Sequence, residues 1–132
     1  MNHIEARALN WIAANTGYKP SEIEFSNNDS PDFITPDGRG FEVKHYMPGD
    51  RCINIYPRQW PKLLQANKCV ILIFGELSHP EAIIPMTELP IGIKRWGKFR
   101  IQSLETNLRS LPREKYLEIL RIKNQAATKV AA

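Results

Sequence analysis

The sequence predicts an α/β or α+β fold in which helices flank a mixed β-sheet. Apolar residues recur at helical spacing near the N-terminus, and a continuous apolar, β-branched run occupies Cys69–Phe74. Between them, a Pro-Asp-Gly turn at residues 36–38 separates two β-prone runs. The order of helix, strands, helix, strands and helix is typical of a layered sandwich. Because 132 residues have room for one hydrophobic core, we expect a single domain over residues 1–132.

The N-terminal half is expected to begin with an amphipathic helix. Ile4, Ala8, Trp11 and Ile12 recur at helical spacing, and Gly17 can take the left-handed conformation that often ends a helix. Three β-prone runs follow, and the last two are expected to form a hairpin around residues 36–39. These strands are expected at residues 23–25, 32–35 and 40–46.

The second half centres on the apolar run Cys69–Phe74, which is typical of a central strand covered on both faces. A helix is expected before this run, at Trp60–Ala66, with a proline near its start. The remaining expected elements are strands at residues 82–86 and 94–101, one or two helices over 103–125 broken near Pro112, and a frayed tail at 129–132.

Composition argues against a membrane protein, because 42% apolar and 24% charged residues are usual for soluble globular chains. The run Cys69–Phe74 is the longest apolar stretch, whereas a bilayer span needs roughly 20 residues. Glu5 and Arg7 interrupt the apolar N-terminus, so we expect no secretory signal and an intracellular, cytoplasmic protein. Cys52 and Cys69 are too few for a disulfide framework, and we expect both to be reduced core residues.

Positive charge is concentrated towards the C-terminus. The net charge is +4, but residues 1–90 contain 8 Lys and Arg against 11 Asp and Glu, whereas residues 91–132 contain 10 against 3. A positive segment attracts polyanions, because neutralising phosphates releases their counterions. The same charges would also suit the solvated surface of a helix, so charge alone leaves both interpretations open.

Asp32, Glu42 and Lys44 form the candidate catalytic group. Side chains alternate along a strand, so Glu42 and Lys44 share one face while Phe41 and Val43 share the other. If Asp32 lies opposite Lys44, and Thr35 therefore lies opposite Phe41, the apolar residues gather on the core side and the three charged side chains converge. A one-residue shift would mix charge into the core.

Two carboxylates that share an ion suit Mg²⁺, a hard cation that takes its other ligands from water and phosphate. Lys44 could then orient a water molecule or stabilise developing negative charge during phosphodiester hydrolysis. The alternative interpretation makes Glu42 and Lys44 an exposed pair on the solvent face of a hairpin, with Asp32 merely ending a turn.

Pro31-Asp32, nine intervening residues and then Glu42-Val43-Lys44 resemble the signature of the PD-(D/E)xK nucleases, the restriction-endonuclease-like superfamily. The resemblance covers roughly residues 1–75 and implies a central mixed β-sheet flanked by helices. It also implies a Mg²⁺ cofactor, for which Mn²⁺ can substitute, with Asp32 and Glu42 as metal ligands and Lys44 as the catalytic cation. By the same resemblance, Glu5 in the first helix would be an accessory acid and Gln59 a positioning residue. Glu5 would otherwise simply favour the helix N-terminus, and Gln59 would be a surface residue near a helix start.

Two branches of the superfamily fit this chain about equally. Its small size, Glu5 and the run Ile53–Tyr56 resemble the archaeal Holliday junction resolvases. The Pro-Asp-Phe-Ile opening and the Arg58-Gln59 pair resemble the virus-type replication-repair nuclease modules. The sequence does not choose between them.

The segment from Lys94 to Arg100 is the best candidate for DNA contact. It interleaves positive charges with aromatic rings, which can hold phosphates and stack on bases. If the segment is one strand, Trp96 and Lys98 share a face, and Trp96 or Phe99 could instead belong to the core. The residues expected to bind DNA are Lys94, Arg95, Trp96, Lys98 and Arg100.

The leading functional hypothesis is a metal-dependent DNA endonuclease that hydrolyses phosphodiester bonds in branched or structured DNA. A non-catalytic nucleic-acid-binding module on a similar scaffold is the main alternative, and a protein-interaction domain is a third. Symmetric cutting of a four-way junction requires two active sites, so a homodimer is expected on such a substrate. The sequence does not distinguish roles in DNA repair, DNA recombination and restriction.

Overall fold

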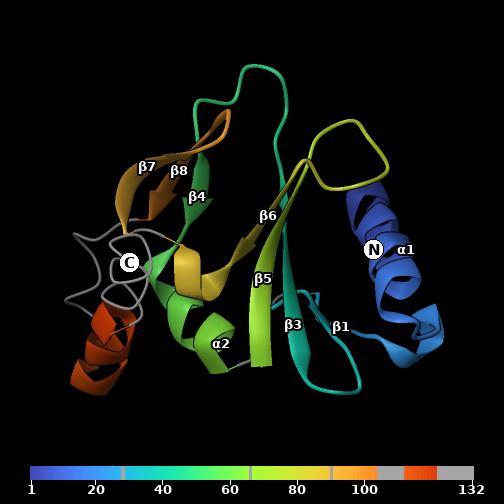
Figure 1. Ribbon diagram of the computed structural model, residues 1–132, viewed down its shortest axis with the longest axis horizontal. Helices are drawn as coiled ribbons and strands as arrows, with labels where there is room; N and C mark the ends of the chain where they lie inside the picture. Colours follow the sequence, from blue (N-terminus) through green and yellow to red (C-terminus); the bar gives the residue numbers. More distant parts are fainter. Residues whose placement is uncertain (28, 66, 90, 104–111, 122–132) are drawn as a thin grey trace, which may run out of the picture.

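The computed structural model describes residues 1–27, 29–65, 67–89, 91–103 and 112–121. Figure 1 shows a sheet in the middle of the molecule, with α1 on one side and α2, a second sheet and a helix over residues 113–121 on the other. The α/β class is therefore confirmed. The helices are α1 (His3–Thr16) and α2 (Trp60–Gln65), and the short 3₁₀ turns are η1 (Pro20–Glu22), η2 (Pro57–Gln59) and η3 (Met86–Glu88).

The first helix, α1, contains the predicted apolar positions and ends at Gly17 as the sequence predicts. The Asn2 side chain accepts from the Glu5 N–H, and the Glu5 side chain accepts from the Asn2 N–H, which forms a capping box. Gly17 ends the helix with φ 82°. Ile4, Ala8 and Ile12 are buried, so the apolar stripe of α1 faces the sheet.

The main sheet has five strands in the order β1-β2-β3-β5-β6 and is mixed, because β3 and β5 run parallel while the other pairs are antiparallel. The apolar run at residues 69–74 forms most of β5, which lies between β3 and β6 as expected of a central strand. The strands are β1 (Glu24–Phe25), β2 (Phe33–Ile34), β3 (Arg39–His45), β5 (Asn67–Phe74) and β6 (Ala82–Pro85).

Two hydrophobic cores lie on the two faces of this sheet, and β5 contributes to both. Leu72 and Phe74 point into the α1-side core, whereas Ile71 and Ile73 point into the α2-side core. The α1-side core also contains Ile4, Ala8, Ile12, Ile23, Phe33 and Phe41. The α2-side core also contains Ile53, Ile55, Trp60, Leu63, Cys69, Ile84, Met86, Leu89, Ile91, Phe99, Ile101 and Ile119.

A second sheet, in the order β4-β8-β7, was not foreseen from the sequence. It comprises β4 (Ile53–Ile55), β7 (Gly92–Trp96) and β8 (Phe99–Ser103), with β4 parallel to β8. The prediction of one strand over residues 94–101 is wrong, because Gly97 adopts φ 58° and lets the chain reverse there. Trp96 therefore pairs with Phe99, and the β7–β8 hairpin replaces the single strand.

The C-terminal region agrees with the prediction only in part. Residues 113–121 are helical, as expected after Pro112, but Ser103 ends β8 instead of beginning a helix. Residues 104–111 and 122–132, including the expected tail at 129–132, lie outside the described part of the chain. Both cysteines are free, as predicted; Cys69 is buried, but Cys52 is only half-buried, beside β4.

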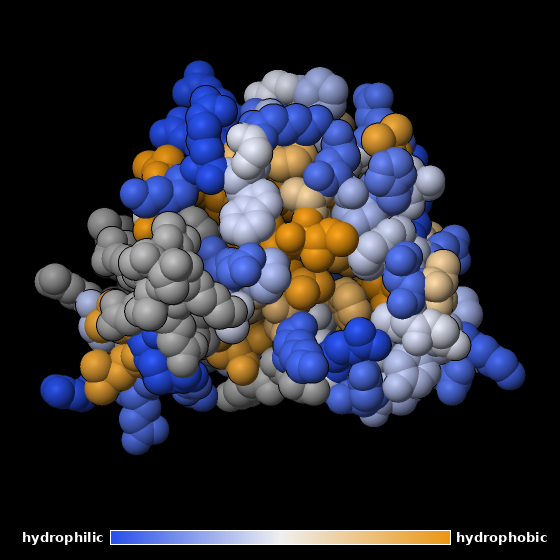
Figure 2. Space-filling view, in the orientation of Figure 1, coloured by the Kyte–Doolittle hydropathy of each residue, from blue (hydrophilic) through white to orange (hydrophobic). Residues whose placement is uncertain are grey.

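None of the helices in the described ranges combines the length and the apolar character that a bilayer span requires. Figure 2 shows a mostly polar face on which apolar side chains gather over β5 and β6, towards α1. Ile83 on β6 is 45% exposed in this region. The α1 helix thus covers β3 and β5 more completely than it covers the edge strand β6.

Candidate active site

The β2–β3 hairpin brings Asp32 beside Glu42. Phe33 pairs with Phe41 and Ile34 pairs with Gly40, so Asp32, one residue before β2, lies at the level of Glu42. The predicted register, with Asp32 opposite Lys44, is wrong by two residues. Because side chains alternate with a period of two, this shift leaves every side chain on its predicted face.

The tight turn explains the correction. The Thr35 N–H donates to the Arg39 carbonyl at 3.0 Å, and the Gly38 N–H donates to the Thr35 carbonyl at 2.8 Å. Gly38 has φ 87°, a left-handed conformation that closes the loop within residues 36–38. The predicted register needed a longer loop, which the glycine makes unnecessary.

Backbone hydrogen bonds hold the two carboxyl groups in place. The Asp32 N–H donates to Glu42 Oε1 at 3.2 Å, and the Val43 N–H donates to Asp32 Oδ2 at 2.7 Å. Glu42 is only 2% exposed and Asp32 is half-buried. Each carboxylate is therefore bound by the backbone of the strand that carries the other, which excludes the interpretation of Glu42 as a solvent-facing residue.

Gln59, at the end of η2, connects Glu42 to Lys44. Its Nε2 donates to Glu42 Oε2 at 2.7 Å, while its Oε1 accepts from Lys44 Nζ at 3.2 Å and from the Tyr56 N–H at 3.0 Å. The two ends of the amide face partners of opposite polarity, so its orientation is set by the network. The structure thus brings Gln59 to two of the three predicted charged residues, Glu42 and Lys44.

Lys44 lies in the same cluster with its side chain 17% exposed. Its Nζ is 3.7 Å from Glu42 Oε2 and 5.9 Å from the centre of the Tyr56 ring. Arg58 Cζ lies 5.5 Å from the centre of the same ring. Burial lowers the pKa of the Lys44 ammonium, while the charges of Glu42 and Asp32 oppose this change.

Negative charge is unfavourable on both carboxyl groups, Asp32 and Glu42. Burial, and then the neighbouring charge of Asp32, raise the pKa of Glu42 to about 8. Burial also raises the pKa of Asp32, against the hydrogen bond from Val43. A cation bound between these groups would relieve their repulsion, and their oxygen atoms are the ligand type that Mg²⁺ prefers.

The carboxylates open onto a cavity of about 360 Å³. Arg58 and Lys62 bring positive charge to its wall, although Lys62 also forms an ion pair with Asp29. The other lining residues are Asn27, Asp29, Ser30, Asp32, Glu42 and Gln59. A phosphate could therefore approach the carboxylates past basic side chains.

Glu5 lies near Asp32, and its charge adds to the effect of burial in raising the pKa of that carboxyl group, but the hydrogen bond of Glu5 lies elsewhere. Its side chain accepts the Asn2 N–H at 2.9 Å in the capping box. Glu5 and Asp32 line a neighbouring cavity of about 440 Å³, together with His3 and His45. Within the described ranges, no three His, Cys, Asp or Glu side chains gather closely enough to hold an ion. An ion at Asp32 and Glu42 would thus need water or substrate for its other ligands.

Sequence reasoning assigned no role to Ser30 or Tyr56. The Ser30 hydroxyl donates to Glu42 Oε2 at 3.2 Å and accepts from Gln59 Nε2 at 3.2 Å. Its position directly before Pro31-Asp32 was the available signal. Tyr56 had no such signal, because its contact joins Lys44 on β3 to the residue that directly follows β4 of the other sheet.

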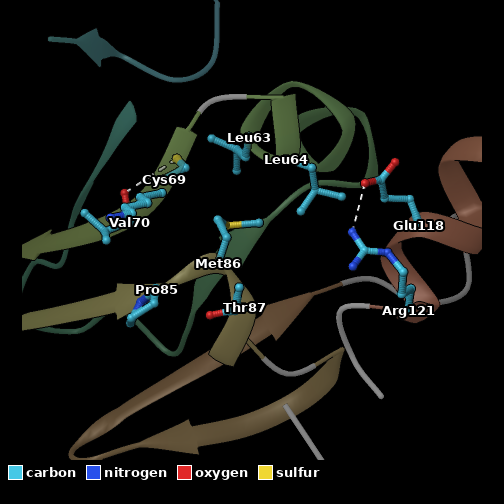
Figure 3. A pocket seen from close by; sticks show the side chains of 10 residues that line it. Leu63, Leu64, Cys69, Val70, Pro85, Met86, Thr87, Glu118 and Arg121 are labelled. Carbon is cyan, nitrogen blue, oxygen red and sulfur yellow. Dashed lines mark hydrogen bonds and ion pairs between the residues drawn. The ribbon is translucent and has the colours of Figure 1, made fainter. Parts of the chain in front are cut away.

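A larger, apolar cavity of about 500 Å³ lies elsewhere, between α2, β5, η3 and the helix over 113–121 (Figure 3). Figure 3 shows Leu63, Leu64 and Met86 around it, with the Glu118–Arg121 ion pair at one side. It shares no lining residue with the carboxylate cavity. Glu118 in its wall is exposed and paired with Arg121, and burial raises the pKa of the Cys69 thiol to about 12, so we place the candidate active site at the smaller cavity.

The segment predicted to bind DNA contains both exposed residues and residues that pack in the core. Lys94, Arg95 and Arg100 are exposed, whereas Trp96 is half-buried and packs against the α2-side core. Lys98 Nζ lies 2.7 Å from Glu81 Oε1 in an ion pair. Phe99 is 2% exposed, so it belongs to the core.

Comparison of the chain with protein-family models, curated proteins and solved structures found no match.

Proposed function

We propose that the protein is a Mg²⁺-dependent endonuclease that hydrolyses phosphodiester bonds in DNA. The observation that carries this proposal is the cluster at the carboxylate cavity. Two neighbouring carboxylates, the half-buried Asp32 and the buried Glu42, lie beside Lys44, and Gln59 hydrogen-bonds to both Glu42 and Lys44. An ion pair between Glu42 and Lys44 with only a structural role would not need Asp32 nearby, because the charge of Asp32 destabilises the charged form of Glu42.

Asp32 and Glu42 would hold the ion in this proposal. The chemistry that bound Mg²⁺ supplies is polarisation of the phosphoryl oxygen and a lowered pKa of a coordinated water. In hydrolysis a water oxygen bonds to phosphorus while the bond to the leaving sugar oxygen breaks. Lys44, held by Gln59, is placed to orient that water or to stabilise the negative charge that develops.

The proposed substrate is branched or otherwise structured DNA. The support is the resemblance of Pro31-Asp32 and Glu42-Val43-Lys44 to nucleases that include junction resolvases, together with the exposed arginines of the β7–β8 hairpin. On a four-way junction we expect a homodimer, because two symmetric cuts require two active sites. Sedimentation of a monomer on junction DNA would contradict this part of the proposal.

Cleavage assays test the proposed activity. Four-way junctions, flaps, linear duplex and single strands are incubated with the protein in Mg²⁺, in Mn²⁺ and in EDTA. We expect cleavage with either metal and none in EDTA. Glu42→Gln and Asp32→Asn should reduce the rate by at least a hundredfold, while DNA binding is kept.

Glu24→Gln is a matched control, because Glu24 is an exposed glutamate on β1. This variant should cleave like the wild-type protein. Circular dichroism establishes that each variant is folded. Cleavage by folded Glu42→Gln and Asp32→Asn at the wild-type rate would contradict the proposal.

The exposed arginines of the β7–β8 hairpin favour a second candidate, a non-catalytic nucleic-acid-binding module. This alternative predicts salt-sensitive DNA binding with no cleavage at any metal concentration. The same set of assays therefore separates the two functions.

A further inference from the structure

The second sheet has an outer face that differs sharply from its inner one. Phe99, Ile101 and Ser103 are buried on the inner face of β8, and Arg100 and Gln102 alternate with them on the outer face. In the ladder, Arg95 pairs with Arg100, and Asn54 on β4 pairs with Gln102. Directly paired residues share a face, so these four polar side chains lie together with Ile93, which pairs with Gln102 and is 52% exposed.

Arg95 and Arg100 form an unfavourable pair. They lie directly opposite each other on an antiparallel ladder, where like charges destabilise the sheet. Both are exposed, and neither forms an ion pair with a carboxylate in the described part of the chain. Lys98, two residues from Arg100, does have such a partner in Glu81. Two adjacent guanidinium groups without a carboxylate partner are suited to an external anion.

This face leads from the arginine pair to the candidate active site. Cys52 Sγ lies 3.4 Å from Gln102 Oε1 and 3.6 Å from Asn54 Oδ1, so the three side chains are contiguous. Because Ile53 pairs with Ile101, Cys52 lies at the level of Arg100. At about 3.3 Å per residue, Tyr56 lies roughly 13 Å further along the chain.

Tyr56 completes the connection. It is 41% exposed, and its ring centre lies 5.9 Å from the Lys44 ammonium and 5.5 Å from the Arg58 guanidinium carbon. Arg58 in turn lines the carboxylate cavity. The outer strip, defined as Arg95, Arg100, Gln102, Asn54, Tyr56 and Arg58, thus runs continuously from the hairpin to the site.

We propose that the outer strip binds the sugar-phosphate backbone of the nucleic acid whose scissile phosphate lies at Asp32 and Glu42. The proposal rests on the proposed function and specifies where the substrate lies. Arg95 and Arg100 bind phosphates, and the amides of Asn54 and Gln102 contact the backbone between them and the site. With one phosphate per about 3.4 Å along each strand, the arginines contact DNA roughly four to seven nucleotides from the cleaved bond.

Binding without metal tests the strip independently of catalysis. The affinity for fluorescent duplex DNA is measured in EDTA over a range of salt concentrations for the double variant Arg95→Gln/Arg100→Gln. The control is Lys94→Gln/Lys98→Gln, which removes the same charge from the same hairpin. Lys94 pairs with Ile101 on the inner face, and Lys98 lies at the turn, so neither belongs to the strip.

The arginine variant should lower the slope of log K against log salt by about 2, since each lost phosphate contact lowers it by about 0.9. The lysine variant should lower it by less than about 1. On substrates whose arms end about three nucleotides from the cleavage position, the arginine variant and wild type should bind alike. Thermal unfolding establishes that both variants are folded.

Three results would contradict the proposal that the outer strip binds the sugar-phosphate backbone. The arginine and lysine variants could have equal salt slopes, the wild type could fail to bind DNA, or polyglutamate could compete as well as DNA of equal charge. Failure of the proposed function is a different result, namely wild-type DNA binding with no cleavage in Mg²⁺. If the wild-type protein cleaves DNA but the arginine variant binds DNA as the wild type does, the proposal for the outer strip is wrong while the proposed function stands.

Discussion

Gln59 holds the charged side chains of the candidate site in position through both ends of its amide. Its Nε2 donates to Glu42 and its Oε1 accepts from Lys44. Removing the amide would leave a buried carboxylate oxygen and a largely buried ammonium each with one partner fewer. Gln59 is therefore a positioning residue in the proposed mechanism, because it acts by orienting Glu42 and Lys44 and not by contacting the substrate.

Replacing Gln59 with alanine should lower kcat by about 10- to 100-fold, as is usual when a residue that orients metal ligands is lost. We expect the Mg²⁺ concentration needed for half-maximal activity to rise, while the KM for DNA changes little. Asn10→Ala, which removes an exposed amide from α1, is the control and should leave both unchanged. An unaltered metal dependence in Gln59→Ala would show that the amide does not orient the carboxylates.

Glu42 should make the stability of the metal-free protein depend on pH. Its pKa is raised from 4.5 to about 8, so the folded protein keeps a proton in this range that the unfolded chain has released. The free energy of unfolding should therefore decrease as pH rises from 4.5 to 8, by an amount of order a few kcal/mol. The lowered pKa of Lys44 acts in the opposite sense, at pH values between its folded-state pKa and 10.5.

Denaturant unfolding at several pH values in EDTA measures this dependence. In Glu42→Gln the decrease should be much smaller, and Mg²⁺ should oppose it in the wild type if the ion binds the deprotonated carboxylates. A wild-type stability that is constant between pH 4.5 and 8 would show that Glu42 does not hold the extra proton.

At the scale of elements, Glu5 at the start of α1 has two candidate roles, as a capping residue of the helix and as an accessory acid at the site. The capping box with Asn2 uses one oxygen of the Glu5 side chain, which a glutamine also provides. An accessory acid at the site would instead need the negative charge. The two roles therefore respond differently to the same substitution.

Glu5→Gln should keep the stability of the protein within about 0.5 kcal/mol, whereas Asn2→Ala should lower it by about 1 kcal/mol through loss of the N-cap. Thermal unfolding measures both. If Glu5 is only a capping residue, Glu5→Gln cleaves DNA at the wild-type rate. A folded Glu5→Gln with strongly reduced cleavage would instead assign the charge of Glu5 to the reaction.

At the scale of the whole molecule, β5 is the strand that joins the two cores. Ile71 faces the α2-side core and Leu72 faces the α1-side core, and both are almost completely buried. Loss of either side chain disturbs a strand that both cores need. We therefore expect the two sides of the sheet to unfold together.

Ile71→Ala and Leu72→Ala should each lower the free energy of unfolding by about 2 to 5 kcal/mol. Ile83→Ala, on the neighbouring strand and 45% exposed, should cost less than about 1 kcal/mol. Tryptophan fluorescence and circular dichroism should give the same midpoint for each protein. Separate transitions would show that the two cores unfold independently.

The fold was predictable where its signals are local. The helix α1 follows from apolar spacing and Gly17, and the central position of β5 follows from an uninterrupted apolar run. The β7–β8 hairpin and the second sheet were not foreseen, because β4 pairs with a strand more than forty residues later in the chain. Such pairing depends on packing against the α2-side core, which a local pattern does not encode.

The sequence by itself determined the face on which each side chain of the hairpin lies. Alternation along a strand is a local property, so Glu42 and Lys44 remained together when the register moved by two residues. The resemblance already implied Gln59 at the site, but only the tertiary structure decided which atoms Gln59 joins and that Ser30 and Tyr56 meet these side chains. These contacts join segments that are distant along the chain or lie on different sheets, and the packing of α2 and the second sheet against β3 and β5 brings them together.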